Sequence, residues 1–358
     1  MSAAVLRLGR SVRRAPMFRD RTNVLASLAL GLGLAWLVAR LLSWAGLHAI
    51  WTLPPGAGSE PCRVARDGAC WAVVHERFRF ILMGGYPYGQ HWRPALACVL
   101  FLGLYAASAC RACWRWWLPF VWVAVPAAVV LLLRGGFWGL PGVPSESWGG
   151  LPLTFLLATV GFGAAIPFAV LLALGRRSGM PAIRALSVAY IELLRGVPLV
   201  TFLFMASLMF PLFLPQGFAI DKLLRAQLAI VMVIAATLAE VVRAGLQGIP
   251  AGQYEAAASI GLRFWPATLL VILPQAFRIT IPALVNVFIA FFKDTSLVAI
   301  IGLFDLLGAA KAVIIDPRWV GFGVEVYVFV AGVYFAFLFA VSRYSLWLEK
   351  SLGPSRVA

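Results

Sequence analysis

Long apolar runs dominate the chain, and the connections between them carry most of the polar residues. A helix needs about 20 predominantly apolar residues to cross the hydrocarbon core of a bilayer. The pattern predicts an all-α, polytopic membrane protein with about eight transmembrane helices, at residues 23–45, 94–110, 117–133, 151–174, 198–217, 226–246, 277–301 and 324–343. The fifth run contains Pro211 and Pro215 and the seventh contains Lys293 and Asp294, so these two fit the criterion least well.

The distribution of Lys and Arg predicts the orientation, because positively charged connections stay in the cytoplasm. Six Arg precede the first run, which is too long for a signal peptide and lacks a nearby A-x-A-like site. Further positive residues fall on the same side as the N-terminus: Arg111, Arg115, Arg176, Arg177, Arg184, Arg195, Arg263, Arg343, Lys350 and Arg356. We therefore expect a multi-pass protein of a bacterial inner membrane with both termini cytoplasmic. The 46–93 loop on the other side also holds Arg63, Arg66, Arg77, Arg79 and Arg93, but long loops count less.

Composition fits this prediction, since 62% of the residues are hydrophobic and 12% are charged, against roughly 25% charged in soluble domains. The net charge of +16 is scattered between the apolar runs and forms no groove-sized block. Such a pattern favours contact with anionic membrane lipid over a nucleic-acid partner. A composition shift near residue 146 predicts an accessory region at 1–146, with three spans and the 46–93 loop, a working core at 150–346, and a cytoplasmic tail at 347–358.

The five cysteines match no zinc ligand set, and the three histidines in the 46–93 loop have no partners at ligand spacing, so we expect no metal site. Cys62 and Cys70 lie in that loop, where an oxidising periplasm permits a disulfide. The sequence leaves open whether they are bonded. Cys110 and Cys113 form a C-x-x-C without a surrounding βαβ pattern, which favours two ordinary interface residues over a redox pair.

The segment from Glu240 to Arg278 has the most specific chemistry in the chain. Pro250 is suited to a first helical turn, and Gly261 can take the positive φ that ends a helix. Three alanines at 256–258 leave the helix surface open to close approach by another protein. We predict two short helices at an angle, the second at 264–272, on the cytoplasmic side.

Glu255, Ala256, Ala257 and Gly261 resemble the E-A-A-x-x-x-G signature of ABC import permeases. The Ile-x-Leu-Pro that follows it in that family stands here as Val271-Ile272-Leu273-Pro274, a conservative departure. The resemblance implies that the short helix is a coupling helix, which docks on a separate ATPase and passes its movement to the spans. It also implies a type I importer transmembrane fold for the C-terminal five helices.

Two further runs narrow the resemblance to polar amino acid permeases of the histidine/glutamine type. They are YIELLRGVPLV at 190–200 and the stretch at 274–302 that contains KDTSL, whereas Ala244 departs from the usual Gly. The accessory part is similar to the general L-amino acid permease branch. The resemblance implies L-amino acid substrates, a periplasmic amino acid-binding protein, an ABC ATPase dimer and a related permease subunit as heterodimer partner.

No G-x-x-x-x-G-K-[ST] phosphate loop is present in the sequence. We therefore expect a transport subunit that is not itself an enzyme and holds no cofactor. In this prediction ATP and Mg are bound by the partner ATPase.

Polar groups inside spans are costly, which suggests a functional site. Glu240 and Arg243 can pair at i,i+3, and Glu240 either contacts substrate or braces the cytoplasmic loop. Asn286, Lys293, Asp294, Thr295 and Ser296 would supply a cavity for the ammonium and carboxylate of a zwitterion. We assign Glu240 and these five residues to a translocation pathway as a hypothesis. Asp305 and Lys311 are expected in an outer re-entrant or interfacial segment.

Two other classes remain open. An ion-gradient-driven secondary amino acid transporter should show matching broken spans in two halves, but the halves here differ. An integral membrane enzyme should place a nucleophile-base pair or a metal-ligand set near an interface, but no such motif accompanies the histidines. Dependence of uptake on ATP separates the favoured class from the secondary transporter.

Overall fold

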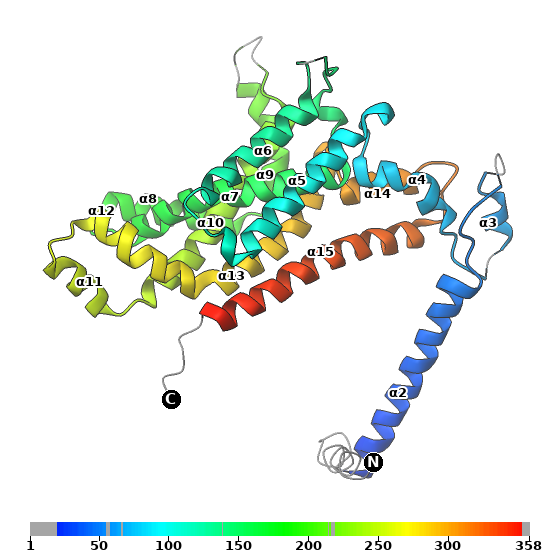
Figure 1. The fold of residues 1–358 in the computed structure, drawn as a ribbon, viewed down its shortest axis with the longest axis horizontal. Coiled ribbons are helices and arrows are strands. Elements are labelled where there is room, and N and C mark those ends of the chain that lie inside the picture. The colour runs from blue at the N-terminus through cyan, green and yellow to red at the C-terminus, as the bar shows by residue number, and fades with distance from the viewer. Residues whose placement is uncertain are drawn as a thin grey trace. The chain divides into compact units, whose positions relative to one another are not determined.

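The computed structural model describes residues 20–54, 58–65, 67–137, 139–213, 215 and 219–352. Helices make up most of this part of the chain, and the short strand β1 covers only Phe304–Asp305 (Figure 1). The expectation of an all-α protein is confirmed. Five of the six N-terminal Arg, together with Arg66, Arg356 and the tail residues 353–358, lie outside the described residues.

The elements before residue 148 include three apolar helices and a loop with short helices of its own. They are α2 (Arg21–Leu42), η2 (Ser43–Leu47), α3 (Glu60–Val64), α4 (Ala72–Met83), η3 (Tyr88–Gln90), α5 (Trp92–Ala109), η4 (Arg111–Cys113), α6 (Leu118–Arg134) and η5 (Ser145–Ser147).

The elements after it contain the long helices of the expected working core. They are α7 (Gly150–Arg176), α8 (Pro181–Gly196), α9 (Leu199–Phe204), η6 (Met205–Met209), η7 (Phe210–Phe213), α10 (Lys222–Gln247), α11 (Ala251–Ser259), α12 (Phe264–Pro266), η8 (Ala267–Ile272), α13 (Leu273–Asp294), η9 (Thr295–Ile301), α14 (Leu306–Ile314) and α15 (Gly323–Leu352). The expected tail at 347–358 begins inside α15.

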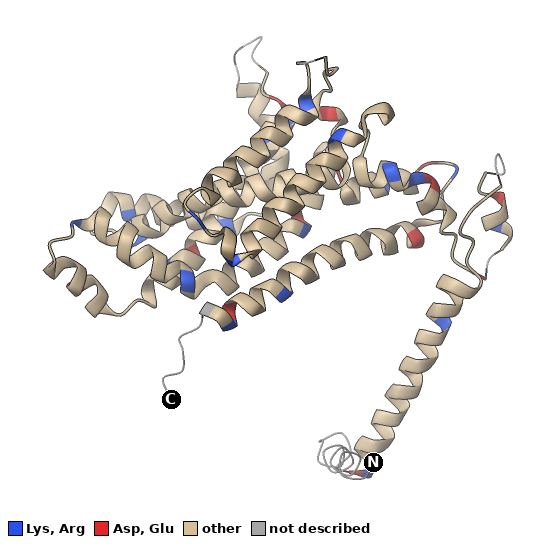
Figure 2. Ribbon diagram, viewed as in Figure 1, with Lys and Arg blue, Asp and Glu red and all other residues tan. Residues whose placement is uncertain are grey.

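Six helical segments in the described part of the chain are long and apolar enough to cross a membrane: Arg21–Leu47, Trp92–Ala109, Gly150–Arg176, Lys222–Gln247, Phe264–Ile301 and Gly323–Ser351. The number becomes seven if a bent pair of helices counts as one span, and α6 adds a shorter apolar helix. The estimate of about eight spans therefore holds approximately. Charged residues lie mostly near helix ends and in connections, and the middles of the long helices are largely apolar (Figure 2).

The fifth expected span, 198–217, begins at a sharp bend. The helical turns Leu199–Phe213 lie inside this span and meet the preceding helix α8 at 99°. The cause is Pro198, which lacks an N–H and disfavours the helical region for the residue before it. Val197 accordingly has extended angles, with φ −110° and ψ 134°. Leu214 and residues 216–218, at the end of the expected run, lie outside the described residues.

The chain forms two compact units, and their boundary differs from the composition shift near residue 146. The smaller unit contains Met1–Glu76 and Pro317–Glu325, and the larger contains Arg77–Asp316 and Val326–Ala358. Phe101 of α5 and Val129 of α6 are buried in the same apolar cluster as Phe155 of α7. Two of the three helices expected to be accessory are therefore part of the core of the larger unit.

Close helix packing in the larger unit depends on small residues, as is typical of membrane helices. A Cβ atom added at Gly161 of α7 would lie 2.6 Å from Ile230 of α10. A Cβ atom added at Gly245 of α10 would lie 2.8 Å from the carbonyl oxygen of Ala276 on α13. These two glycines let α10 approach α7 and α13 closely.

Arg93 was counted above as a loop charge, but the structure buries it completely. Its guanidinium donates hydrogen bonds to the carbonyl oxygens of Leu132 (2.7 Å), Leu133 (3.1 Å) and Pro141 (3.0 Å). These carbonyls lie at and just beyond the C-terminus of α6, where the helix leaves acceptors unpaired and a cation is favourable. Arg93 thus caps α6, and it contributes nothing to the exposed charge of the loop.

In the smaller unit, Cys62 and Cys70 are joined by a disulfide with the Cα atoms 5.7 Å apart. The backbone N–H of Cys70 donates to the buried Glu325 carboxylate (3.0 Å). The Trp71 indole donates to the carbonyl of Ala45 (2.7 Å) and stacks on Trp51. The bonded loop therefore contacts η2, the segment after η2 and the start of α15.

Thiol counting by mass spectrometry tests this bond. Alkylation of the denatured, unreduced protein should modify three cysteines, namely Cys98, Cys110 and Cys113, and five after reduction. The disulfide closes a loop with a separation of 8 residues, so Cys62→Ser should lower the stability of this unit by about 2 kcal/mol. Modification of all five cysteines without reduction would contradict the bond.

Candidate coupling site

The two short helices predicted at an angle to each other form at 251–272, a segment that we call the elbow. The turn between them has the geometry expected from Gly261. α11 follows Pro250 and ends at Ser259 with Ile260 as its C-cap, after which Gly261 has a φ of +78°. The N–H of Gly261 donates to the carbonyl of Ala258 (2.9 Å), and the N–H of Leu262 donates to that of Ala257 (3.1 Å). This pair of bonds is the Schellman motif, which requires a left-handed residue at this position.

Most of α11 faces outward from the fold. Ala257 is buried and Tyr254 is half-buried, whereas Glu255, Ala256 and the remaining residues of the helix are exposed. α12 and η8 then lead into α13, which begins with buried Leu273 and exposed Pro274. Pro274 lies in the first turn of α13, where its missing N–H costs little. The helix that carries Glu255, Ala256 and Ala257 is thus mostly exposed and lies at one end of the larger unit (Figure 1).

Three hydrogen bonds, made by two side chains of α11, hold this helix against the long helices. The Tyr254 hydroxyl donates to the carbonyl of Leu246 on α10 (3.1 Å) and accepts a hydrogen bond from Arg177 (3.1 Å), which follows α7. Gln275 of α13 donates to the side-chain oxygen of Gln253 (3.0 Å). Displacement of α11 would therefore act on the ends of three long helices. A single sequence gives no signal that pairs Arg177 with Tyr254, 77 positions away.

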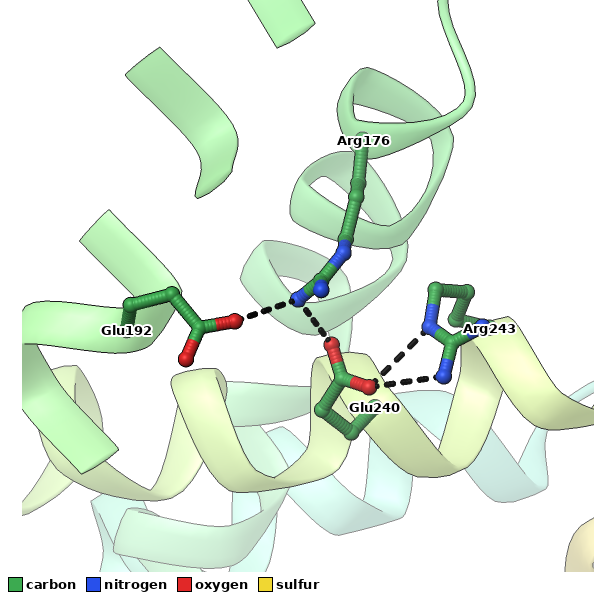
Figure 3. Close-up of polar contacts among 4 residues, drawn as sticks. All are labelled: Arg176, Glu192, Glu240 and Arg243. Atoms are coloured by element: carbon green, nitrogen blue, oxygen red, sulfur yellow. Dashed lines mark hydrogen bonds and ion pairs between the residues drawn. The ribbon is translucent and has the colours of Figure 1, made fainter. Parts of the chain in front are cut away.

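Glu240 lies in a charged cluster close to the elbow (Figure 3). One carboxylate oxygen contacts Arg176 of α7 (2.6 Å), and the other accepts two hydrogen bonds from Arg243 (3.0 and 2.9 Å). The same nitrogen of Arg176 also contacts Glu192 of α8 (3.1 Å). The expected i,i+3 pair forms, and both oxygens of Glu240 are engaged. The geometry thus favours the brace over the substrate contact for this residue.

The other pathway candidates divide into two groups. Asn286, Lys293 and Ser296 line one cavity of about 810 Å³ between α13 and α15. Asp294 is exposed without lining this cavity, and Thr295 is buried with its hydroxyl donating to the carbonyl of Phe292 (2.9 Å). Three of the five residues are therefore brought together.

Glu240 and Lys293 lie at opposite ends of the larger unit. Glu240 is two turns before the end of α10, which leads into α11. Lys293 is at the far end of α13, which starts directly after the elbow and rises roughly 30 Å over its length. The two residues consequently serve different sites.

Asp305 was expected in an outer re-entrant or interfacial segment, and its side chain is completely buried. It caps the N-terminus of α14 by accepting from the N–H of Gly308 (2.9 Å), and it accepts a hydrogen bond from the Tyr334 hydroxyl (3.1 Å). Burial raises the pKa of Asp305 above its usual range, and the two hydrogen bonds act in the opposite direction. Tyr334 also lines the cavity of Lys293, so Asp305 supports one wall of that cavity. An Asp that directly precedes an apolar helix is a typical N-cap, so this role of Asp305 was predictable from the sequence.

Comparison with known proteins decides the family. Residues 165–353 match the family described as binding-protein-dependent transport system inner membrane component. The chain belongs to this family. The permease contains the predicted coupling helix within the matched residues, and the resemblance to ABC import permeases with the type I fold is confirmed.

Long relatives align over nearly the whole permease. It is 46% identical over 351 residues to the inner membrane amino-acid ABC transporter permease protein YhdY of Escherichia coli K12, covering 96% of this chain and 93% of the relative. It is 36% identical over 390 residues to the glutamate/glutamine/aspartate/asparagine transport system permease protein BztC of Rhodobacter capsulatus, covering 90% and 88%.

A shorter relative shows that the permease carries additional sequence. The glutamate/aspartate import permease protein GltK of Escherichia coli O157:H7 is 32% identical over 206 residues, which are 91% of that protein and 56% of this chain. The chain is thus a multi-pass inner-membrane permease of the ABC importer class. As such it is a transport component without an ATPase site of its own, and it works with ATPase and binding-protein partners.

Proposed function

We propose that the chain is the permease subunit of an importer for L-amino acids, driven by an ABC ATPase dimer that docks on α11. The single observation that supports this most strongly is the exposed helix Ala251–Ser259, which is seated on α7, α10 and α13 through Tyr254 and Gln253. Its exposed Ala256, Ala258 and Ser259 leave a small-residue surface for a groove on the ATPase. A movement of the ATPase would reach three long helices through these contacts.

We propose the remaining partners on the basis of the family. A periplasmic amino acid-binding protein delivers the substrate, and a related permease forms the heterodimer that encloses the path. ATP and Mg²⁺ are held by the ATPase dimer, because this sequence lacks a phosphate loop. Both termini are cytoplasmic in this proposal, on the side of Arg176, Arg177 and α11.

We assign the substrate path to the cavity lined by Asn286, Lys293 and Ser296. The Lys293 ammonium suits the substrate carboxylate, and the two neutral groups suit further polar atoms. Because a hydrogen bond to a charged group contributes about 1.5–3 kcal/mol, Lys293→Gln should raise the KM for uptake by roughly 10- to 100-fold. Uptake of a mixture of labelled L-amino acids into proteoliposomes measures this. Lys350→Gln, the same change at an exposed site near the end of α15, is the control and should leave KM unchanged.

Purification of the full-length chain with its associated subunits, followed by mass identification and reconstitution, tests the proposed function. We expect an ATPase with a phosphate loop, a second permease of related sequence, and uptake that requires ATP. The alternative is an ion-gradient-driven secondary transporter. Uptake driven by an imposed proton or sodium gradient without ATP would favour that alternative and overturn the proposal.

A further inference from the structure

Arg176 and Arg177 stand together where α7 ends. Arg176 is the last residue of the helix, and Arg177 is its C-cap, with its N–H bonded to the carbonyls of Leu174 and Gly175. Cations are favoured at this end of a helix by its dipole. Consecutive residues on a helix point about 100° apart, so the two side chains can serve different neighbours.

Arg176 joins α7 to both α8 and α10. One of its guanidinium nitrogens, Nη1, contacts both Glu240 at 2.6 Å and Glu192 at 3.1 Å (Figure 3). The Glu240 side chain is 18% exposed, whereas that of Glu192 is 58% exposed. Exposed ion pairs contribute little because water competes for both charges. The contact with α10 is therefore the stronger one, and the contact with α8 is the one that a small displacement can break.

Arg177 joins α7 to α11. It donates a hydrogen bond to the Tyr254 hydroxyl (3.1 Å), and its guanidinium lies 5.7 Å from the centre of the Tyr254 ring. Tyr254 is one of two residues in α11 that are not exposed. Arg177 consequently holds one of the few side chains through which α11 can act on α7.

The surroundings leave room for movement at this contact. A cavity of about 650 Å³ lies beside it and is lined by Arg177, Tyr254, Ile183, Phe264, Trp265 and Thr268, among others. α11 is joined to α10 by only the three residues 248–250. A shift of α11 is thus passed to α10 through the backbone and to α7 through Arg177.

We infer that Arg176 and Arg177 are positioning residues that convert displacement of α11 into a rearrangement of α8 against α7 and α10. This inference rests on the proposed function of α11 as the coupling helix. When α11 moves, Arg177 draws the end of α7 with it, and Arg176 keeps its bond to Glu240 while it releases Glu192. The cluster has two positive and two negative side chains and therefore no net charge: Arg176, Arg243, Glu192 and Glu240. It stays neutral when Arg176 releases Glu192.

The test uses the complete transporter, with its partner ATPase, in proteoliposomes. ATP hydrolysis and uptake of a mixture of labelled L-amino acids are measured together. For Arg176→Gln and Arg177→Gln, uptake per ATP hydrolysed should fall roughly fivefold, while hydrolysis falls less. This scale is set by one partly exposed ion pair for Arg176 and by one hydrogen bond from a charged group for Arg177. Arg176→Lys, which retains the charge, should recover part of the loss.

Arg184→Gln is the matched control, because Arg184, in the first turn of α8, donates to the carbonyl of Ser178 just before that helix and does not contact α11 in the hydrogen bonds of the described residues. It should leave uptake per ATP unchanged. If Arg177 and Tyr254 act through one contact, Arg177→Gln combined with Tyr254→Phe should lose no more than the larger single variant. Additive losses would contradict a shared contact.

The outcomes separate this inference from the proposed function. If the wild-type complex shows no ATP-driven uptake, the proposed function itself fails. If the wild type transports and the Arg176 and Arg177 variants keep its ratio of uptake to hydrolysis, the inference is overturned. A proportional fall of uptake, hydrolysis and protein level would indicate a purely structural role and would also overturn it.

Discussion

Gly261→Pro is expected to abolish ATP-driven uptake while the spans remain inserted in the membrane. Gly261 has a φ of +78°, whereas proline is fixed near −65°. Proline would also remove the N–H that donates to the carbonyl of Ala258. The combined cost of about 3 kcal/mol or more falls on the turn that sets the angle between α11 and α12. Uptake in proteoliposomes and the amount of protein in the membrane fraction measure the two parts of this prediction.

Gly261→Asn is the matched control for this turn. Asparagine tolerates the left-handed region better than other residues with a side chain, and a Cβ atom at position 261 would meet nothing within 4 Å. Gly261→Asn should therefore retain most of the uptake. Uptake by Gly261→Pro at the wild-type rate would show that the elbow does not transmit the ATPase movement.

Arg93→Met is expected to lower the yield and thermal stability of the folded protein more than any other charge removal in the 46–93 loop. Its guanidinium is completely buried and donates to the carbonyls of Leu132, Leu133 and Pro141. Methionine fills a similar volume but removes the donor from the carbonyls of Leu132 and Pro141 and one of two donors from that of Leu133, which also accepts from Tyr86. The expected cost is about 3 kcal/mol. The unfolding midpoint in detergent measures the effect.

Arg79→Met is the control for Arg93→Met. Arg79 lies in the same loop, is exposed, and has its guanidinium over the rings of Phe78 and Tyr88. Its replacement should change stability by about 0.5 kcal/mol or less. Equal midpoints for Arg93→Met and the wild type would contradict the assigned cap of α6.

Features that depend on nearby residues could be predicted from the sequence. The long apolar helices follow from composition over about 20 residues. The elbow follows from Pro250 and Gly261, whose backbone preferences act within one turn. The bend before Leu199 also has a local cause, since Pro198 restricts the backbone of Val197.

Features that depend on how helices pack could not be predicted. Arg176 and Glu240 are 64 positions apart, and nothing in either residue's local sequence indicates its partner. Arg93 was treated as a loop charge because its acceptors lie 39 to 48 positions later. The compact units differ from the boundary near residue 146 for the same reason, since α5 and α6 are assigned by their contacts with α7.

The side of the membrane on which α11 lies tests the central claim most directly. Ser259→Cys places a thiol at an exposed position on α11, and serine at Cys110 and Cys113 removes the accessible background. A membrane-impermeant maleimide is then applied to sealed spheroplasts and to inside-out vesicles. If α11 faces the cytoplasm, the introduced cysteine is labelled in the inside-out vesicles alone. Labelling in intact spheroplasts would contradict the central claim, because an ATPase in the cytoplasm could not reach this helix.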